Sequence, residues 1–280
     1  MRELPRWSTP TLIVNATEGD RVPSLDVMSF NLRHAGDRPP HSWPERRPAM
    51  AELLRATSPA VIGTQEGLYQ QLRDIEQDLD GRYAWIGTGR SGGSRGEFMA
   101  VFHDTRRLAP VEYEHYWLSG TPEVIASNTW GGSSIRMVTW VRLRDLRSGG
   151  EFYVVNTHLD VSSAEARMRS AELIIRRLAG LDRSLPLLVT GDFNVPAHGD
   201  PVYDAFLGAG LVDTWDAAGH RGGQYGTFHG YGPLEPGGDR IDWILASPGV
   251  RTHTAACPTF RLDGRFPSDH LPVQVSLTLG

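Results

Sequence analysis

Residues 186–194 read Pro186-Leu187-Leu188-Val189-Thr190-Gly191-Asp192-Phe193-Asn194. The first five have the composition of a short buried strand. A carboxylate, Asp192, and an amide, Asn194, come directly after that strand. Glycine, Asp and Asn also form turns, so a plain turn is the alternative. The order predicts a core strand that delivers polar side chains to one edge of a sheet, where hydrolytic sites are commonly built.

The same order of an apolar strand and a polar cluster recurs along the chain. Four further clusters end predicted strands, at residues 30–33, 65–66, 156–160 and 268–270, and a sixth precedes or opens a strand at 239–242. Together they contain Asn, Asp, Glu and His, which are the side chains that hydrolytic sites use. We therefore expect the clusters to converge on one site.

Strands and helices mix along the whole length of the chain. Strand patterns occupy residues 25–31, 60–65, 84–87, 98–103, 135–143, 151–157, 186–190, 241–246 and 272–279. Apolar stripes at helical spacing follow possible capping boxes at Ser42 and Ser162, and a further stripe occupies residues 68–79. Two hairpin-like strand pairs favour mixed sheets. The pattern predicts one α/β domain over residues 25–280, a tail or edge strand at 1–24, and a glycine-rich surface loop at 219–238.

The composition excludes several classes of function. The net charge is −5, from 28 basic and 33 acidic residues, and every basic residue is arginine. Such a chain does not suit a protein that coats duplex nucleic acid, because that binding neutralises many phosphates. The single cysteine, Cys257, permits no intrachain disulfide. No apolar run suits a signal peptide or a membrane span, so we expect a cytoplasmic protein without a membrane association.

The residue types in the clusters indicate metal-assisted hydrolysis. Asn, Asp and Glu offer hard oxygen ligands, which suit Mg²⁺ better than softer metals. Histidines beside aspartates can act as bases or stabilise charge on phosphate oxygens. A metal, a positioned water and donors around phosphoryl oxygens are what the cleavage of a phosphate ester requires.

The six clusters, in this order and spacing, resemble the endonuclease/exonuclease/phosphatase family, a deoxyribonuclease-like superfamily. The resemblance spans about residues 25–279 and is strongest to uncharacterised bacterial members with deadenylase-like motifs. It implies a four-layer α/β sandwich, in which two mixed β-sheets lie face to face and are flanked by helices. Arg33 departs from the abasic-site endonuclease branch, which has an acid there, and residues 238–242 match the inositol phosphatase branch only in part.

The resemblance implies a metal site. Glu66 is the principal expected ligand, Asn31 lies at the metal, and Asp269 completes or supports the ligand shell. The expected ion is Mg²⁺, with Mn²⁺ as a substitute. As alternatives, Asn31 is a strand cap and Glu66 is a solvated residue before a helix.

The resemblance also implies catalytic roles. Asp192 and Asn194 are expected on the scissile phosphate, with Asp192 positioning or deprotonating the attacking water. His270 is expected to contact the phosphate while Asp242 orients its ring, and His158 is expected to donate to a phosphate oxygen.

Six further residues are candidates for substrate binding: Glu97, Trp117, Trp130, Asp160, Arg167 and His229. Glu97 belongs to a Gly-Glu-Phe segment in which the family has an acid lining the pocket. Core packing is the alternative for the two tryptophans and a surface position for Arg167, and Asp160 is expected to support the loop of His158. The remaining histidines, 34, 41, 103, 115, 198, 220 and 253, are assigned to the surface or to loops.

Three hypotheses of function follow. The first is an Mg²⁺-dependent phosphoric ester hydrolase, phosphodiesterase or phosphatase, that acts on a phosphorylated small molecule or a single-stranded nucleic-acid end. The second is a degenerate binding module. The third, a dinuclear metallophosphatase of another fold, requires Asp-x-His near the start and Gly-Asn-His later, and the sequence has neither. Nothing implies a stable protein partner.

Overall fold

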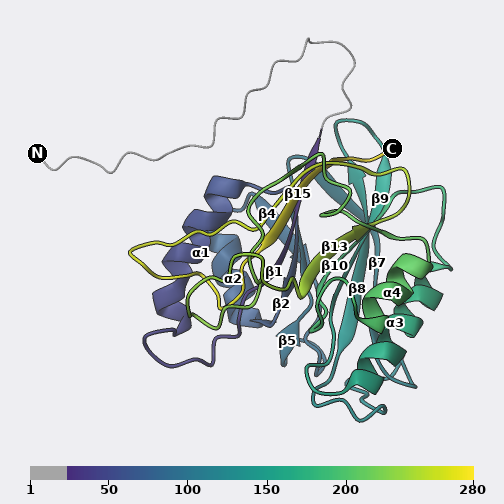
Figure 1. Cartoon of the computed structure of the whole chain (residues 1–280), viewed down its shortest axis with the longest axis horizontal. Helices are drawn as coiled ribbons and strands as arrows, with labels where there is room; N and C mark the ends of the chain where they lie inside the picture. The colour runs from purple at the N-terminus through teal and green to yellow at the C-terminus, as the bar shows by residue number, and fades with distance from the viewer. Residues whose placement is uncertain (1–23) are drawn as a thin grey trace, which may run out of the picture.

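The computed structural model describes residues 24–280, in which two large β-sheets pack face to face between pairs of helices (Figure 1). The predicted four-layer sandwich is confirmed. The proposed tail or edge strand at 1–24 lies, apart from Ser24, outside the described residues. None of the helices between residues 24 and 280 combines the length and apolar character needed to cross a bilayer.

The seven-stranded sheet carries the N-terminal half of the site. Its strands, in spatial order, are β12 (His220–Arg221), β14 (Arg251–Ala256), β15 (Val273–Thr278), β1 (Leu25–Asn31), β2 (Val61–Gln65), β6 (Val101–Asp104) and β4 (Tyr83–Ile86). The central pair, β1 and β2, is parallel, whereas β15 and β6 flank it in antiparallel orientation.

The six-stranded sheet carries the other half. Its order is β11 (Val212–Asp213), β13 (Asp242–Ala246), β10 (Leu187–Asp192), β9 (Glu151–His158), β8 (Met137–Asp145) and β7 (Leu108–Trp117). Here β9 and β10 are the parallel pair. A small two-stranded sheet joins β3 (Gly67–Leu68) to β5 (Glu97–Phe98).

Helices cover the outer face of each sheet. Helices α1 (Trp43–Thr57) and α2 (Tyr69–Asp78) pack on the seven-stranded sheet, and α3 (Ala164–Leu178) and α4 (Pro201–Gly208) pack on the six-stranded sheet (Figure 1). Both faces of the central strands are therefore buried. In β1, Val27 packs between the sheets while Met28 packs under the helices, and this is why these strands read as continuous apolar runs.

Several sequence-based boundaries are wrong. The strand expected at 98–103 is split between β5 and β6, which pair with different strands. Helix α3 is capped by Ser163, which accepts from Ala166 N, and not by Ser162. The start of helix α1 after Ser42 is confirmed, and the helix runs through Pro48 in its second turn. The patterns of β7, β14 and α4 were not recognised.

A buried polar seam joins the two sheets behind the predicted site. Asn156 of β9 donates from Nδ2 to the carbonyls of Thr64 and Ala100, at 2.8 and 3.0 Å. Its Oδ1 accepts from Gln65 Nε2 at 2.7 Å and from Thr190 Oγ1 at 3.1 Å. All four hydrogen bonds are buried, so the seam stabilises one relative position of the sheets.

Gly63 of β2 permits this close approach, because a Cβ at residue 63 would lie 2.0 Å from Thr190 Oγ1. We therefore expect Gly63→Ala to lower the free energy of unfolding by about 1–3 kcal/mol, the cost of overpacking a core. Urea unfolding measures this. The control is Gly208→Ala in α4, where a Cβ meets nothing within 4 Å and no loss is expected. Equal stability of the two variants would contradict the constraint.

Histidines inside the fold predict acid sensitivity. His103 is buried, so its assignment to the surface or to a loop was wrong. His115 is partly buried and contacts Thr139. Burial lowers the pKa of His115 to about 4 and also lowers that of His103. The unfolded chain binds these protons near pH 6.5 and the folded protein does not, so stability falls as the pH drops from about 6.5 to 4.

On lowering the pH from 7.5 to 5.0, the free energy of unfolding should fall for both proteins. We expect the fall to be smaller for His115→Gln than for the unchanged protein, by roughly 1 kcal/mol. Urea unfolding at both pH values checks this. His220→Gln, at an exposed position in β12, is the control. A pH dependence that His115→Gln leaves unaltered would disprove the contribution of this imidazole.

Candidate active site

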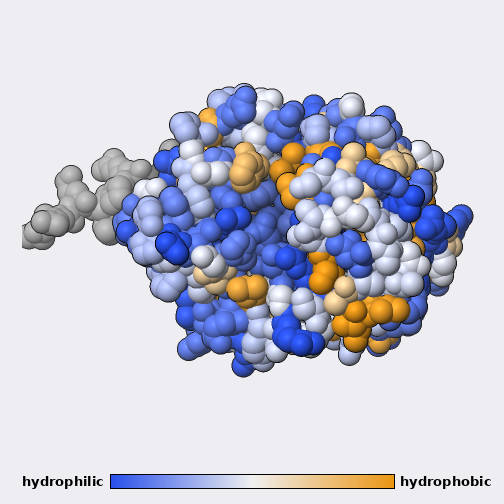
Figure 2. All heavy atoms as spheres, turned by 90° about the horizontal axis from the view of Figure 1, so that it is seen from below, coloured by the Kyte–Doolittle hydropathy of each residue, from blue (hydrophilic) through white to orange (hydrophobic). Residues whose placement is uncertain are grey.

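The polar clusters meet where the parallel strands of the two sheets end. Asn31 of β1 is the register partner of Gln65 in β2, and Glu66 follows that residue. In the facing sheet, Asp192 of β10 is the partner of His158 in β9. Figure 2, which views the molecule from below Figure 1, shows hydrophilic residues gathered around a hollow in the middle of the face.

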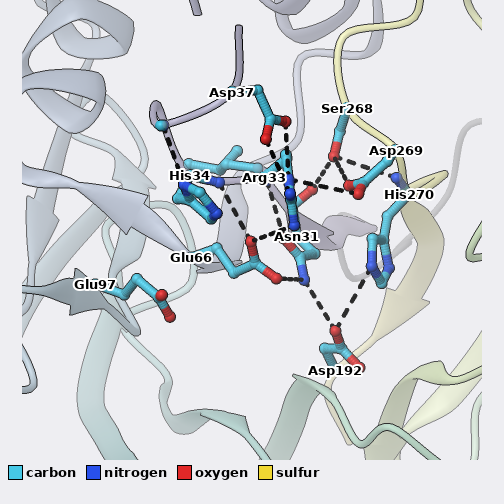
Figure 3. A network of polar contacts seen from close by, with 12 residues as sticks. Asn31, Arg33, His34, Asp37, Glu66, Glu97, Asp192, Ser268, Asp269 and His270 are labelled. Carbon is cyan, nitrogen blue, oxygen red and sulfur yellow. Dashed lines mark hydrogen bonds and ion pairs between the residues drawn. The ribbon is translucent and has the colours of Figure 1, made fainter. Parts of the chain in front are cut away.

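One amide joins the carboxylates of the two sheets. Asn31 Nδ2 donates to Glu66 Oε1 at 3.0 Å and to Asp192 Oδ2 at 2.9 Å (Figure 3). Glu66 has a left-handed backbone with φ of 61°, and it accepts from His34 N. Such a conformation is costly for a residue with a side chain and persists where the surroundings enforce it. The solvated-residue alternative therefore does not describe Glu66. Asn31 joins the two carboxylates and also caps its strand as the alternative predicted, because its Oδ1 accepts from Arg33 N at 2.9 Å.

Arg33 lies between two of the expected metal ligands. Its Nη1 is 3.8 Å from Glu66 Oε2, and its Nε is 3.6 Å from Asp269 Oδ2. The same guanidinium donates to Asp37 at 2.9 Å, and this bond lowers the pKa of the Asp37 carboxyl. Glu66 and Asp269 thus face one cation from opposite sides (Figure 3).

Three groups in the described part of the chain are compact enough to hold a metal ion, and two of them lie at this site. Glu66, His158 and Asp192 form one, and Asp192, Asp242 and His270 form the other, with ligand atoms within 4.8 Å of one another. Glu66 falls in the first group as expected, whereas Asp269 belongs to neither. A third, partly exposed group lies elsewhere, at His198, Asp213 and Asp216.

His270 is held as a buried imidazolium. Its Nδ1 lies 2.9 Å from Asp242 Oδ2, and its Nε2 lies 3.8 Å from Asp192 Oδ2. Burial by itself lowers the pKa of His270, but the charge and hydrogen bond of Asp242 and the charge of Asp192 outweigh it and raise the pKa to about 10. Thr227 Oγ1 accepts from Asp242 N and fixes this strand end.

His158 is the opposite case. Burial lowers its pKa well below the ordinary value, so its imidazole is neutral. Its Nε2 lies 3.0 Å from Asn194 Nδ2 and 3.4 Å from Asp192 Oδ2. Burial and the nearby Asp242 raise the pKa of Asp192 to about 7. Asn194, with φ of 55°, donates from its backbone N to Asp192 Oδ1.

Comparisons with known proteins identify the family of this chain. The model of the endonuclease/exonuclease/phosphatase family matches residues 28–270. The chain belongs to this family. A comparison with curated proteins finds no match.

Solved structures of family members superpose over nearly the whole chain. A mannosyl-6-phosphatase of Bacteroides thetaiotaomicron is 33% identical with a TM-score of 0.85, covering 91% of this chain and 99% of its own. A family protein of Bacteroides vulgatus is 28% identical, with a TM-score of 0.86 and coverage of 92% and 100%. The human Nocturnin catalytic domain shares the fold at 19% identity, with a TM-score of 0.72 and coverage of 93% and 95%.

In this family member, only some of the expected substrate-binding residues lie beside the site. Glu97 is half-buried beside the site and accepts from Arg90 Nη1 at 2.6 Å. Trp117 is buried and donates from Nε1 to the carbonyl of Arg90, so it anchors that loop and offers no stacking face. Trp130 is half-buried and packs against the core of the six-stranded sheet. The packing alternative describes Trp117.

Three other candidates stabilise loops. Asp160 accepts hydrogen bonds from four serines: Ser133, Ser134, Ser162 and Ser163. Arg167 donates to the carbonyls of Asp160 and Val161 and so contacts backbone. His229 packs its ring on Phe266, while its backbone N donates to the carbonyl of Asp269.

Four further residues contact or border this region, although the sequence did not predict a role there for them. His34 had been assigned to the surface or to loops, but its backbone contacts Glu66. Phe228 is 56% exposed, and its ring centroid is 5.1 Å from that of His270. No pattern in the sequence distinguishes Arg136, which directly precedes β8. The fourth, Arg46, interrupts the apolar stripe of α1, and a charge in such a stripe was the signal available.

Arg46 organises two loops of the site. Its buried guanidinium donates to five carbonyls, those of Leu32, Arg33, His34, His41 and Pro267. Three of them belong to the loop after Asn31, and Pro267 precedes the segment of Asp269 and His270. One side chain therefore stabilises the positions of both segments.

We expect Arg46→Met to lower the free energy of unfolding by about 3 kcal/mol or more, because it leaves several buried carbonyls without a donor. Urea unfolding provides the measurement. Arg47→Met is the matched control, since Arg47 is a partly exposed neighbour paired with Asp78, and surface pairs contribute about 1 kcal/mol or less. If both variants lose equal stability, the special role of Arg46 is wrong.

Proposed function

We propose that this protein is a divalent-metal-dependent hydrolase of phosphoric esters, and that its substrate is a phosphorylated sugar or similar small molecule. One observation carries the proposal. Glu66 and Asp192, from different sheets, converge on the amide of Asn31, and Nε2 of the His270 imidazolium lies 3.8 Å from the same Asp192 oxygen.

The donor set fits a hard divalent cation. Glu66 and Asp192 offer carboxylate oxygens within one compact group, and Asn31 lies between them. Mg²⁺ prefers oxygen ligands and needs only one or two carboxylates, and Mn²⁺ accepts the same donors. We propose Glu66 and Asn31 as the centre of this site, with Asp269 supporting it across Arg33. A bound cation would polarise a phosphoryl oxygen and stabilise the developing negative charge.

The remaining residues supply proton transfer and orientation. Asp192 is the group proposed to position and deprotonate the attacking water, and Asn194 N fixes its carboxylate. His270 donates to a phosphoryl oxygen, since Asp242 occupies Nδ1 and leaves Nε2 facing the site. The neutral His158 contacts Asp192 and Asn194, which supports a role beside the attacking water.

Two observations favour a small phosphorylated substrate. The similar protein of Bacteroides thetaiotaomicron is described as a mannosyl-6-phosphatase, at 33% identity over 91% of this chain. The net charge of −5 does not suit strong binding of a long polyanion.

A single-stranded nucleic-acid end is the second candidate. The exposed ring of Phe228 beside His270 favours it, because aromatic faces stack on bases. The same ring can also pack on the apolar face of a sugar, so substrate assays must separate the two.

We expect hydrolysis of a phosphate ester with Mg²⁺ or Mn²⁺ and none with EDTA, and Glu66→Gln should lower turnover about 100-fold or more while the fold stays intact. The substrates are mannose 6-phosphate, p-nitrophenyl phosphate, bis-p-nitrophenyl phosphate, single-stranded DNA and poly(A). Asp192→Asn is the blank. Glu52→Gln, at an exposed position on α1, is the matched control.

Each outcome separates the hypotheses. Sugar phosphate turnover supports the first candidate, and cleavage of a polymer supports the second. Near-normal activity of Glu66→Gln would contradict the metal assignment. An inactive wild-type protein would favour the binding-module hypothesis.

A further inference from the structure

Arg136 is a buried cation without a protein partner beside the site. Its side chain belongs to a residue that is 7% exposed, yet neither Nε nor Nη1 has a hydrogen-bond partner within residues 24–280. Burying an unpaired charge costs several kcal/mol, so buried arginines are normally bound by acceptors. Arg46 follows that rule with its five carbonyls. The guanidinium of Arg240 is paired with Asp213 at 2.9 Å, although its Nη1 has no partner, whereas Arg136 has no such pairing among the described residues.

The fold places Arg136 at the catalytic edge. It directly precedes β8, in which Val138 is the register partner of Thr157 in β9, next to His158. The ends of β8, β9, β10 and β13 are neighbours in one sheet. Arg136 therefore extends the row that contains His158, Asp192 and Asp242.

The local backbone fixes this position. The carbonyl of Arg136 accepts from Leu118 N at 2.8 Å. Two residues earlier, Ser134 N donates to Asp160, and Ser133 donates to the same carboxylate oxygen. Asp160 thus positions the segment that leads into Arg136. This contact explains why Asp160 lies near the site.

The charges that face Arg136 leave its guanidinium available. They are Glu97, Arg90, Asp192 and Asp160. Glu97 is already bound by Arg90 at 2.6 Å, and Asp160 is occupied by its four serines. Asp192 is bound by Asn31 and Asn194. None of these acids forms a hydrogen bond with Arg136 in the described structure.

We infer that Arg136 binds the substrate phosphate and selects phosphomonoesters over phosphodiesters. Near neutral pH a phosphomonoester approaches a charge of −2, whereas a diester carries −1. A guanidinium without a partner among the described residues, at the edge of the site, can compensate the second charge, and its planar donors suit phosphate oxygens. This inference rests on the proposed function and specifies the substrate class of the same site.

The test compares Arg136→Met with the unchanged protein on p-nitrophenyl phosphate and on bis-p-nitrophenyl phosphate. We expect kcat/KM for the monoester to fall about 10- to 100-fold and that for the diester to change less than about threefold. Arg136→Lys should retain part of the monoester activity. The control is Arg144→Met, at the far, exposed end of β8, where Arg144 pairs with Glu151.

Binding of inorganic phosphate in the presence of Mn²⁺ gives a readout that needs no turnover. Calorimetry should show about tenfold weaker binding by Arg136→Met, with thermal unfolding at or above the wild-type temperature because an unpaired buried charge is removed. Equal losses on both esters, or unchanged phosphate binding, would overturn the inference. If the wild-type protein hydrolyses neither ester, the proposed function fails, while the phosphate titration still decides the role of Arg136.

Discussion

The amide of Asn156 is the contact on which the rest of the structure depends. Its four buried hydrogen bonds reach Thr64, Gln65 and Ala100 on one side and Thr190 on the other. The hydrophobic effect is not directional, whereas the hydrogen bonds of a fully satisfied amide form in one position only. The separation between Glu66 and Asp192, which belong to different sheets, is set by this seam, and the absence of a side chain at Gly63 makes the approach possible.

The local charges then give two similar histidine side chains different protonation states. His158 and His270 are both buried, yet one is neutral and the other charged, because Asp242 contacts only His270. Arginines serve equally different purposes in this lysine-free chain. Arg46 binds backbone, Arg33 lies between acids, and Arg136 has no partner among the described residues. Only Arg46, which interrupts the apolar stripe of α1, is distinguished by its local sequence.

Much of the architecture was predictable because both faces of the central strands are buried. Continuous apolar runs such as 186–190 locate those strands, and the polar residues that follow them locate the site. The edge strand β7 escaped prediction, because its exposed face carries Glu112 and Glu114 and its pattern is not that of a core strand. A split such as that between β5 and β6 depends on which strands pair, and local sequence does not encode pairing.

The site itself was predictable in its centre and less so at its border. Asn31, Glu66 and Asp192 converge, as their positions at or directly after strand ends indicate. His270 joins them although the expectation that residues 268–270 end a strand was wrong, because this segment precedes β15. The roles of Trp117 and Arg167 depend on where their side chains point, which the sequence does not show. Trp117 points into a buried cluster, and Arg167 points toward backbone carbonyls. Arg136 could not be assigned from sequence, because its distinguishing property is the lack of an acceptor in three dimensions.

The left-handed backbone at Arg33, Glu66 and Asn194 affects how this protein would respond to selection. Any residue with a Cβ is strained there, and glycine is not, so glycine at 66 or 194 would relieve about 1 kcal/mol of strain. A laboratory evolution experiment that rewarded heat resistance alone would thus enrich glycine at these positions. The selected proteins would be more stable to heat, but they would lack the carboxylate of Glu66 and the amide of Asn194 at the site.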